Sequence, residues 1–324
     1  MAAIVTSPCT QLHAPTGKIR HKSLPGNGAR VQSLGRARAL ATPRCYTQGV
    51  LTLSWTDDVD SRTNRYVRRW MRHFPLLRAS YVESWWEALR HAALPGELLP
   101  LSAEQRDLLI EDHWRRVTGR SAPSPSAFEA IVVGLEERIL RAQRFSPTGA
   151  AFVRLGSRAP LDSVQGLDAE FQVDGGTEAL ELLLDSERVF DDLCLAQECH
   201  YEPAILVRPW LDVPPASELR AFLRGRELVG LSQRHACSPL PVLIARADDY
   251  ERQVQLRCEE LAERWPLDDL VVDFACLEDE AWVVDLHPWL PWTEGALFSW
   301  EEDDFADYAF RYLRHREPGA AWGE

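Results

Sequence analysis

The chain has 324 residues and a formal net charge of −13, and 45% of its residues are apolar, which is enough for a sizeable hydrophobic core. This length fits one large domain or two small ones. The charge is uneven: residues 1–56 hold seven basic and no acidic side chains, which leaves 29 basic and 49 acidic side chains for the rest. An acidic body repels the phosphate backbone of nucleic acids, so the composition argues against a general DNA- or RNA-binding protein.

Seven cysteines are scattered along the chain without a C-x-x-C pair, and the nearest two are Cys194 and Cys199. This spacing fits neither a disulfide framework nor a zinc site. No apolar run approaches the roughly 20 residues that a membrane-spanning helix needs. We therefore expect a cytoplasmic protein with reduced thiols.

The N-terminal part of the chain divides into two regions. Residues 1–56 are rich in small and polar residues and are expected to form a disordered basic tail. An organelle transit peptide, or a start codon assigned too early, would have the same composition. Residues 57–148 predict a mostly helical region, with a loop between Pro95 and Pro100 and a turn cluster at 121–126.

The last helix of that region has a regular apolar pattern. Ser126 and Glu129 have the S-x-x-E spacing of a capping box, and apolar residues follow at helical spacing to about Arg144. The side chains expected to face the core are Phe128, Ile131, Val132, Leu135 and Ile139.

Residues 149–316 predict an α+β core with antiparallel sheets, and residues 317–324 a short tail. Near its end, Ser299 and Glu302 repeat the capping-box spacing and predict a final amphipathic helix through Tyr312. The elements expected before it are a strand at 151–155, a helix at 177–195 interrupted near Asp185–Ser186, a strand at 204–210, a hairpin of ELRAFLR and ELVGLSQ across Gly225, a helix at about 245–264, and a hairpin of LVVDFAC (270–276) and AWVVDLH (281–287).

The second hairpin carries two carboxylates inside apolar strands. Asp273 and Asp285 each stand between two large apolar residues. A buried ionised carboxylate costs several kcal/mol unless it is paired or bound to a metal. Alternation places Asp285 and His287 on one strand face. Two carboxylates on neighbouring strands favour a hard cation between them, and the alternative is that one or both point to solvent from a half-exposed sheet.

Three arginines interrupt or end apolar strands: Arg154, Arg208 and Arg220. Each one alone is typical of an exposed edge position, but a guanidinium group is also well suited to phosphate. Together with the two aspartates they predict a cleft for phosphate and a metal ion. The sequence lacks the common motifs of other nucleotide-binding and catalytic sites: it has no G-x-x-x-x-G-K-[ST] loop, no H-E-x-x-H and no G-x-S-x-G.

These segments resemble the cell division cycle protein 123 family, a divergent branch of the ATP-grasp fold. RHFPLLRASYV at 72–82 is a weaker match to the family's N-terminal portion. The main resembling stretches occur in family order, cover most of residues 150–302, and read AFVRLGSRAPLDS, ILVRPWLDVPPASELRAFLRGRELVGLSQRH, LVVDFACLEDEAWVVDLHPW and TEGALFSWEE.

The resemblance implies an ATP-grasp fold, in which two α/β subdomains with antiparallel sheets enclose a nucleotide cleft that binds ATP and magnesium. It implies that Arg154 and Arg220 act as catalytic cations on the transferred phosphoryl group, and that the metal is held at Asp273, Asp285 and His287. The residues that it implies for nucleotide binding are Arg154, Arg208, Trp210, Glu218, Arg220 and Arg234.

One departure from the family pattern affects the expected function. His287 replaces the Asn of the family's D-F-N-P element, and imidazole suits softer metals better than magnesium. The resemblance favours an ATP-dependent carboxylate–amine ligase that acts on a protein or peptide. The alternative is an assembly chaperone for a translation factor or another protein, which binds ATP without appreciable turnover, and a third reading is a structural protein with a dead site. The expected partners are ATP and a protein or peptide, with no membrane and no nucleic acid.

Overall fold

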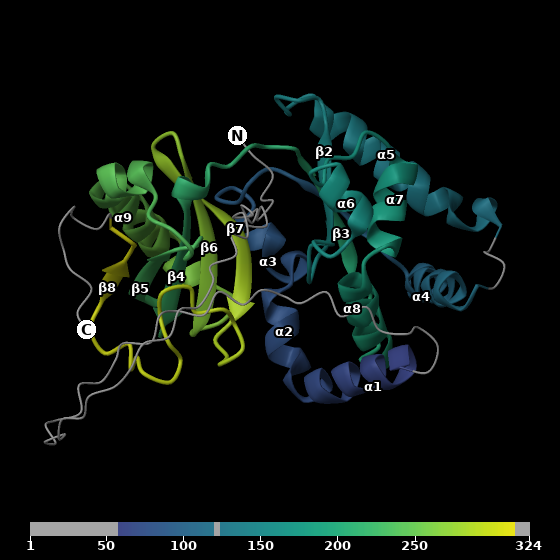
Figure 1. Cartoon of the computed structure of the whole chain (residues 1–324), viewed down its shortest axis with the longest axis horizontal. Coiled ribbons are helices and arrows are strands. Elements are labelled where there is room, and N and C mark those ends of the chain that lie inside the picture. Colours follow the sequence, from purple (N-terminus) through teal and green to yellow (C-terminus); the bar gives the residue numbers. More distant parts are fainter. Residues whose placement is uncertain (1–57, 120–123, 315–324) are drawn as a thin grey trace, which may run out of the picture. The chain divides into compact units, whose positions relative to one another are not determined.

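A computed structural model describes residues 58–119 and 124–314 of the chain (Figure 1). The fold is α+β, as the sequence predicts, and its framework consists of one three-stranded and one five-stranded sheet. The tails expected at 1–56 and 317–324 lie outside the described residues. Within 58–119 and 124–314, no helix combines the length and the apolar character that crossing a membrane requires.

The helices match the sequence prediction in most places. Ser186 caps the second of two helices that share the predicted 177–195 segment, which confirms the interruption there. The capping box predicted at Ser126 is wrong: Pro125 starts a 3₁₀ turn that runs directly into the helix at Glu129, so its i→i+3 bonds replace a side-chain cap. The α-helices are α1 (Asp58–Trp70), α2 (Phe74–Ser80), α3 (Val82–Leu89), α4 (Ala103–Thr118), α5 (Glu129–Gln143), α6 (Val164–Asp168), α7 (Gly176–Leu184), α8 (Glu187–Glu198) and α9 (Pro241–Leu261).

The small sheet consists of β1 (Glu97–Pro100), β2 (Ala151–Leu155) and β3 (Ala204–Pro209) in the order β1-β3-β2, with antiparallel pairs throughout. Strand β1 lies where the sequence predicts only a loop between two prolines, because its partner β3 is about a hundred residues away. All residues of β2 and β3 are buried, as the continuous apolar runs predict.

The large sheet contains both predicted hairpins. Its strand order is β7-β6-β4-β5-β8, and every pair is antiparallel except β5–β8. Gly225 and Arg226 join β4 to β5 with φ values of 56° and 68°, the positive pair that a two-residue hairpin turn requires. The strands are β4 (Glu218–Arg224), β5 (Glu227–Gln233), β6 (Leu270–Leu277), β7 (Glu280–Pro288) and β8 (Ala309–Arg311).

The segment after β7 differs from its prediction. Instead of a helix that begins at Ser299, the chain forms β8, which pairs in parallel with β5. The N–H of Ser299 donates to the Asp303 carboxylate at 2.7 Å, so this serine does not cap a helix. Phe305 has a φ of 54°, which breaks a helical run, and its ring stacks on Phe298 with centroids 5.1 Å apart. The edge of β5 and the aromatic cluster therefore outweigh the local helical pattern.

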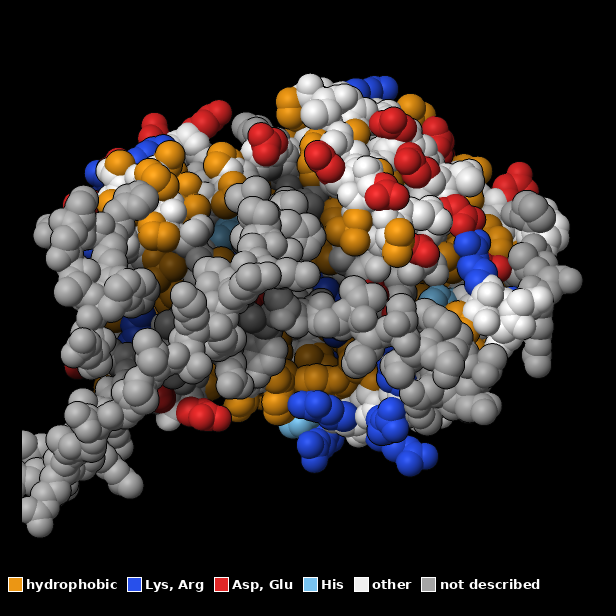
Figure 2. All heavy atoms as spheres, in the orientation of Figure 1, with side chains coloured by type: hydrophobic (Ala, Val, Ile, Leu, Met, Phe, Trp, Pro, Cys, Tyr) orange, Lys and Arg blue, Asp and Glu red, His pale blue; other side chains and the backbone are white. Residues whose placement is uncertain are grey.

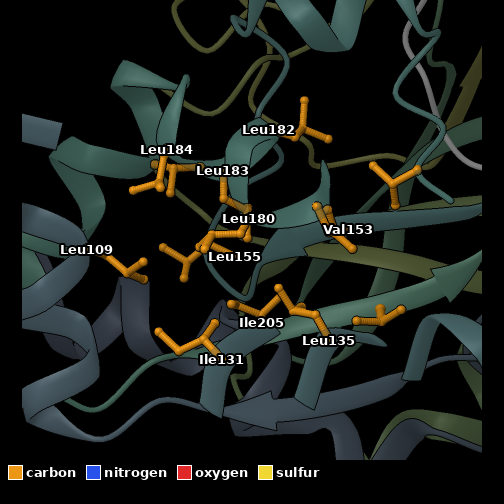
Figure 3. Packing of buried hydrophobic residues seen from close by; sticks show 14 of the residues in the cluster. Leu109, Ile131, Leu135, Val153, Leu155, Leu180, Leu182, Leu183, Leu184 and Ile205 are labelled. Atoms are coloured by element: carbon orange, nitrogen blue, oxygen red, sulfur yellow. The ribbon is translucent and has the colours of Figure 1, made fainter. Parts of the chain in front are cut away.

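The two largest hydrophobic cores in the described part of the chain hold the sheets. The first lies between the small sheet and α4, α5, α7 and α8, and the predicted core residues Ile131, Leu135 and Ile139 belong to it with at most 1% exposure. Figure 3 shows Leu135 close to Ile205 of the sheet, in the cluster to which Ile131 and Val153 also belong. The second core lies around the large sheet, α3 and α9, and it includes Leu206 of β3. The small sheet thus packs one face on the helices and the other toward the second core.

Candidate functional site

A row of polar residues runs straight across the large sheet. The strand register pairs Ser232 of β5 with Arg220 of β4, Arg220 with Asp273 of β6, and Asp273 with Asp285 of β7. Directly paired residues project from the same face of a sheet, so all four side chains lie on one face. Alternation in sequence predicts that Asp285 and His287 share a face but cannot predict this register.

An irregularity in the ladder accompanies the row. Asp273 pairs with Asp285, but the next residue of β6, Phe274, pairs with Val283, so Val284 has no opposite residue. A bulge of this kind turns the strand locally and commonly stands next to functional sites. Here it exposes the backbone carbonyl of Val284 to the small sheet.

Asp273 is surrounded by two arginines and a histidine. Arg220 donates to both of its oxygens, each at 2.7 Å, and the Nε atom of Arg234 lies 3.4 Å from Oδ2. The Nε2 atom of His287 lies 2.9 Å from the same Oδ2. Burial by itself would raise the pKa of Asp273, but Arg220, Arg234 and His287 outweigh it and hold the pKa well below its ordinary value.

Asp285 is bound from the other sheet. Nη1 of Arg154, from β2, donates to Oδ2 of Asp285 at 2.7 Å, and the Arg154 residue is 5% exposed. Nε of Arg154 also donates to the carbonyl of Leu155 at 3.1 Å. The expected meeting of a strand arginine with one of the two aspartates is therefore present, and it joins the small sheet to the edge strand β7 of the large sheet (Figure 1).

Arg208 is a buried cation with an incomplete set of partners. It faces the same way as Arg154, because β2 and β3 pair Phe152 with Arg208, two residues from Arg154. Its Nη1 donates to the carbonyl of Val284 at 3.2 Å, but Nε and Nη2 are buried and donate to no partner among the described residues. Burial lowers its pKa to about 9, Arg154 lowers it as well, and Asp285 opposes the shift.

The loop after β7 closes one side of the site. Nη1 of Arg220 donates to the carbonyl of Glu294 at 2.5 Å, and Nη1 of Arg234 donates to the Glu294 carboxylate at 2.6 Å. Sequence reasoning missed Glu294 as a site residue. The only available signal was its position in TEGALFSWEE, one of the stretches that carry the family resemblance.

Two of the expected site residues lie apart from the row. The carboxylate of Glu218 is buried and contacts Nε2 of His235 at 2.9 Å. Trp210 is buried in the first hydrophobic core, and its backbone N–H donates to Ala150 at 3.0 Å. The structure thus gathers Arg154, Arg208, Arg220, Arg234, Asp273, Asp285 and His287, whereas Glu218 and Trp210 flank them.

The backbone just after Arg154 packs closely against strand β3 and helix α3. Gly156 follows β2, and a Cβ atom on it would lie 1.6 Å from Oε2 of Glu83 in α3. The Gly156 N–H donates to the Ala204 carbonyl at 2.8 Å, and its own carbonyl accepts from Val82 at 3.1 Å. Only glycine fits between β3 and α3 at this point without moving Glu83.

Comparison with the sequences of known proteins gives three findings. The model of the D123 family matches residues 132–319. The chain is 22% identical over 252 residues to a translation initiation factor eIF2 assembly protein from Xenopus laevis, which covers 67% of this chain and 74% of that protein. It is also 29% identical over 179 residues to a cell division cycle protein 123 from Eremothecium gossypii, which covers 49% of this chain and 48% of that protein.

Among solved structures, the chain matches that of Cdc123 from Schizosaccharomyces pombe. The sequence identity is 22% and the TM-score is 0.57, and the match covers 70% of this chain and 90% of that chain. The two proteins therefore share a fold.

Proposed function

This chain belongs to the D123 family, and from that premise we propose that it is an ATP-grasp-type protein that binds ATP with magnesium. In this proposal, Arg154 and Arg208 of the small sheet hold the phosphates against the polar row of the large sheet. The observation that carries the proposal is the buried guanidinium group of Arg208, which has two nitrogen atoms without a partner among the described residues.

A buried cation without a full set of partners is costly. Leaving a buried polar group unsatisfied costs about 1–3 kcal/mol, and more when the group is charged. Arg154 stands close enough to lower the pKa of Arg208 further, so the two guanidinium groups repel each other. An anion with several oxygens would satisfy both groups at once, because a guanidinium group binds phosphate through two parallel hydrogen bonds.

The aspartates fit the magnesium that accompanies ATP. Magnesium takes oxygen ligands, and it is usually bound by one or two carboxylates plus water and phosphate oxygens. In the described part of the chain, no group of three or more His, Cys, Asp or Glu side chains could hold a metal, so phosphate oxygens would complete the set. Asp285 and Asp273 would hold the ion, which neutralises phosphate charge when bound. We assign His287, whose Nε2 contacts Asp273, to positioning that carboxylate.

Two functions are compatible with ATP binding. The relatives named translation initiation factor eIF2 assembly proteins favour an assembly factor that acts on another protein, so we place this role first. A ligase would need Arg154 and Arg220 to stabilise the transferred phosphoryl group. ADP formation that requires a peptide acceptor would favour the ligase, and ATP binding without turnover would favour the assembly factor.

The central experiment compares two buried arginines by calorimetric titration with ATP and magnesium. Arg208→Met removes the incompletely paired charge, so we expect the thermal stability to stay the same or to increase. We also expect the ATP affinity to fall at least tenfold, because a loss of about 1.4 kcal/mol of charge-assisted hydrogen bonding corresponds to a factor of ten. Arg106 serves as the matched control, since it is also buried but is paired with Asp107 and the Tyr201 carbonyl. Arg106→Met should lower stability and leave the ATP affinity unchanged. Equal ATP affinities in wild type and Arg208→Met would refute the proposal.

A further inference from the structure

A basic stretch without acidic residues runs through part of the N-terminal helices. Residues 64–82 contain five arginines and no Asp or Glu, in a chain whose net charge is −13. Arg68, Arg69, Arg72 and Arg78 are all exposed. In the part of the chain that the structure describes, none of these four pairs with a carboxylate. Figure 2 shows arginine side chains, coloured blue, gathered at the lower edge of the molecule, where Figure 1 places α1.

Aromatic rings from two distant parts of the chain lie next to these arginines. Trp292, from the loop after β7, packs on Trp70 and His73 with ring centroids 5.0 and 4.8 Å apart. The Arg69 guanidinium lies over both tryptophan rings, 5.1 Å from the Trp70 centroid and 5.9 Å from that of Trp292. Trp292 is nevertheless 39% exposed, which is a large value for a tryptophan that packs on other aromatic rings.

We propose that this basic–aromatic surface, defined by Arg68, Arg69, Arg72, Arg78, Trp70 and Trp292, binds an acidic segment of a partner protein. Four exposed guanidinium groups that pair with no carboxylate of residues 58–119 or 124–314 complement a run of Asp or Glu side chains. Trp and Arg are also the residues that most often dominate binding energy at protein interfaces. Exposed Met71 and Leu76, each 41% exposed, supply aliphatic contacts for apolar side chains of the same segment.

Charge excludes the most obvious alternative within the chain. Residues 1–56 carry seven basic side chains and no acidic one, so their charge does not complement this surface. A nucleic acid is the other polyanion to consider. It would run from this short basic stretch onto an acidic body, and its phosphate backbone offers nothing apolar to Met71 and Leu76. A short acidic peptide fits both the size and the mixed chemistry of the surface.

The surface is connected to the polar row through one loop. Glu294, which contacts Arg220 and Arg234, follows Trp292 by only two residues. A partner that moves Trp292 would therefore act on the segment that closes the site. Binding at the surface itself needs no nucleotide, so this proposal and nucleotide binding can fail separately.

The test is fluorescence anisotropy on the full chain without nucleotide. The probe is a labelled twelve-residue peptide of Asp and Glu with two Leu and one Trp, and the comparison probes are its Asn/Gln counterpart and a twelve-nucleotide single-stranded RNA. Arg69→Glu/Arg72→Glu should weaken binding of the acidic peptide at least tenfold. The control Arg90→Glu/Arg252→Glu makes the same change in net charge at exposed arginines elsewhere, and it should bind like wild type.

Melting temperatures verify that the variants are folded, and Arg69→Gln/Arg72→Gln gives a milder change if charge reversal disturbs α1. Trp292→Ala should lower the affinity for the acidic peptide several-fold without affecting the salt dependence of binding. The proposal is overturned if the acidic peptide binds no better than its neutral counterpart, or if both double variants bind equally. It is also overturned if RNA binds more tightly than the peptide and loses affinity in Arg69→Glu/Arg72→Glu.

Discussion

Asp273 lies directly opposite Asp285 in the β6–β7 ladder, yet each carboxylate is neutralised by an arginine from a different strand. Arg220 binds Asp273 within the large sheet, and Arg154 reaches Asp285 from the small sheet. Like charges in directly opposed positions destabilise a sheet unless they are compensated. This arrangement therefore makes the two sheets depend on each other for charge balance.

Removal of Arg220 should be strongly destabilising. Arg220 is 2% exposed and binds both oxygens of Asp273, and breaking a buried pair from one side costs about 3–5 kcal/mol. Since Arg234 and His287 remain next to Asp273, we expect Arg220→Met to lie at the lower end of that range in urea unfolding. The double variant Arg220→Met/Asp273→Leu should recover most of the loss. A double variant no more stable than the single one would show that Arg220 contributes by packing alone.

Asp285 should determine the magnesium dependence of ATP binding. We expect ATP with magnesium to raise the melting temperature of wild type more than ATP alone, because the cation bridges phosphate and carboxylate. In Asp285→Asn the additional shift should largely disappear. Asp279→Asn is the matched control, since Asp279 lies in the turn of the same hairpin with a 99% exposed side chain. Equal magnesium effects in all three proteins would contradict the role of Asp285.

Gly156 should not tolerate a side chain while Glu83 is present. In Gly156→Ala the new Cβ would meet Oε2 of Glu83 at 1.6 Å, so Glu83 or the end of β2 must move. Overpacking of this kind costs typically about 1–3 kcal/mol, and displacement of β2 should also weaken ATP binding through Arg154. Glu83→Ala should restore much of the stability in the double variant, apart from the lost hydrogen bond from Tyr201. If thermal unfolding finds the double variant worse than both single variants, the clash is not the cause.

Asp191 should give the protein an unusual pH dependence. Burial is the main cause that raises the pKa of Asp191 to about 6, against the lowering effect of Arg62 and Thr63. The folded state then holds an additional proton between about pH 4 and pH 6, so its free energy of unfolding decreases as the pH rises through that window.

The Asp191→Asn variant removes this titration. Relative to wild type, its free energy of unfolding should therefore rise between pH 4 and pH 7, by an amount on the order of 1–3 kcal/mol. Asp249→Asn is the control, since Asp249 also contacts an arginine but its side chain is 53% exposed. Parallel pH profiles of wild type and Asp191→Asn would rule out the raised pKa.

Local sequence patterns predict most helices and strands and the types of residue at the site. Continuous apolar runs identified β2 and β3, paired runs identified both hairpins, and helical spacing placed Ile131, Leu135 and Ile139 in a core. The same local reasoning missed β1 and predicted a helix where β8 forms, because both strands are stabilised by partners far away in sequence.

The relations among the charged groups were decided by tertiary structure alone. Periodicity places Asp285 and His287 on one face, but only the register of β6 and β7, with its bulge at Val284, sets Asp273 opposite Asp285. Only the packing of one sheet toward the other brings Arg154 to Asp285 and leaves Arg208 without a full set of partners among the described residues. Residue type and spacing act over a few neighbours along the chain, whereas the balance of a buried charge depends on every group that folding brings within a few ångströms of it.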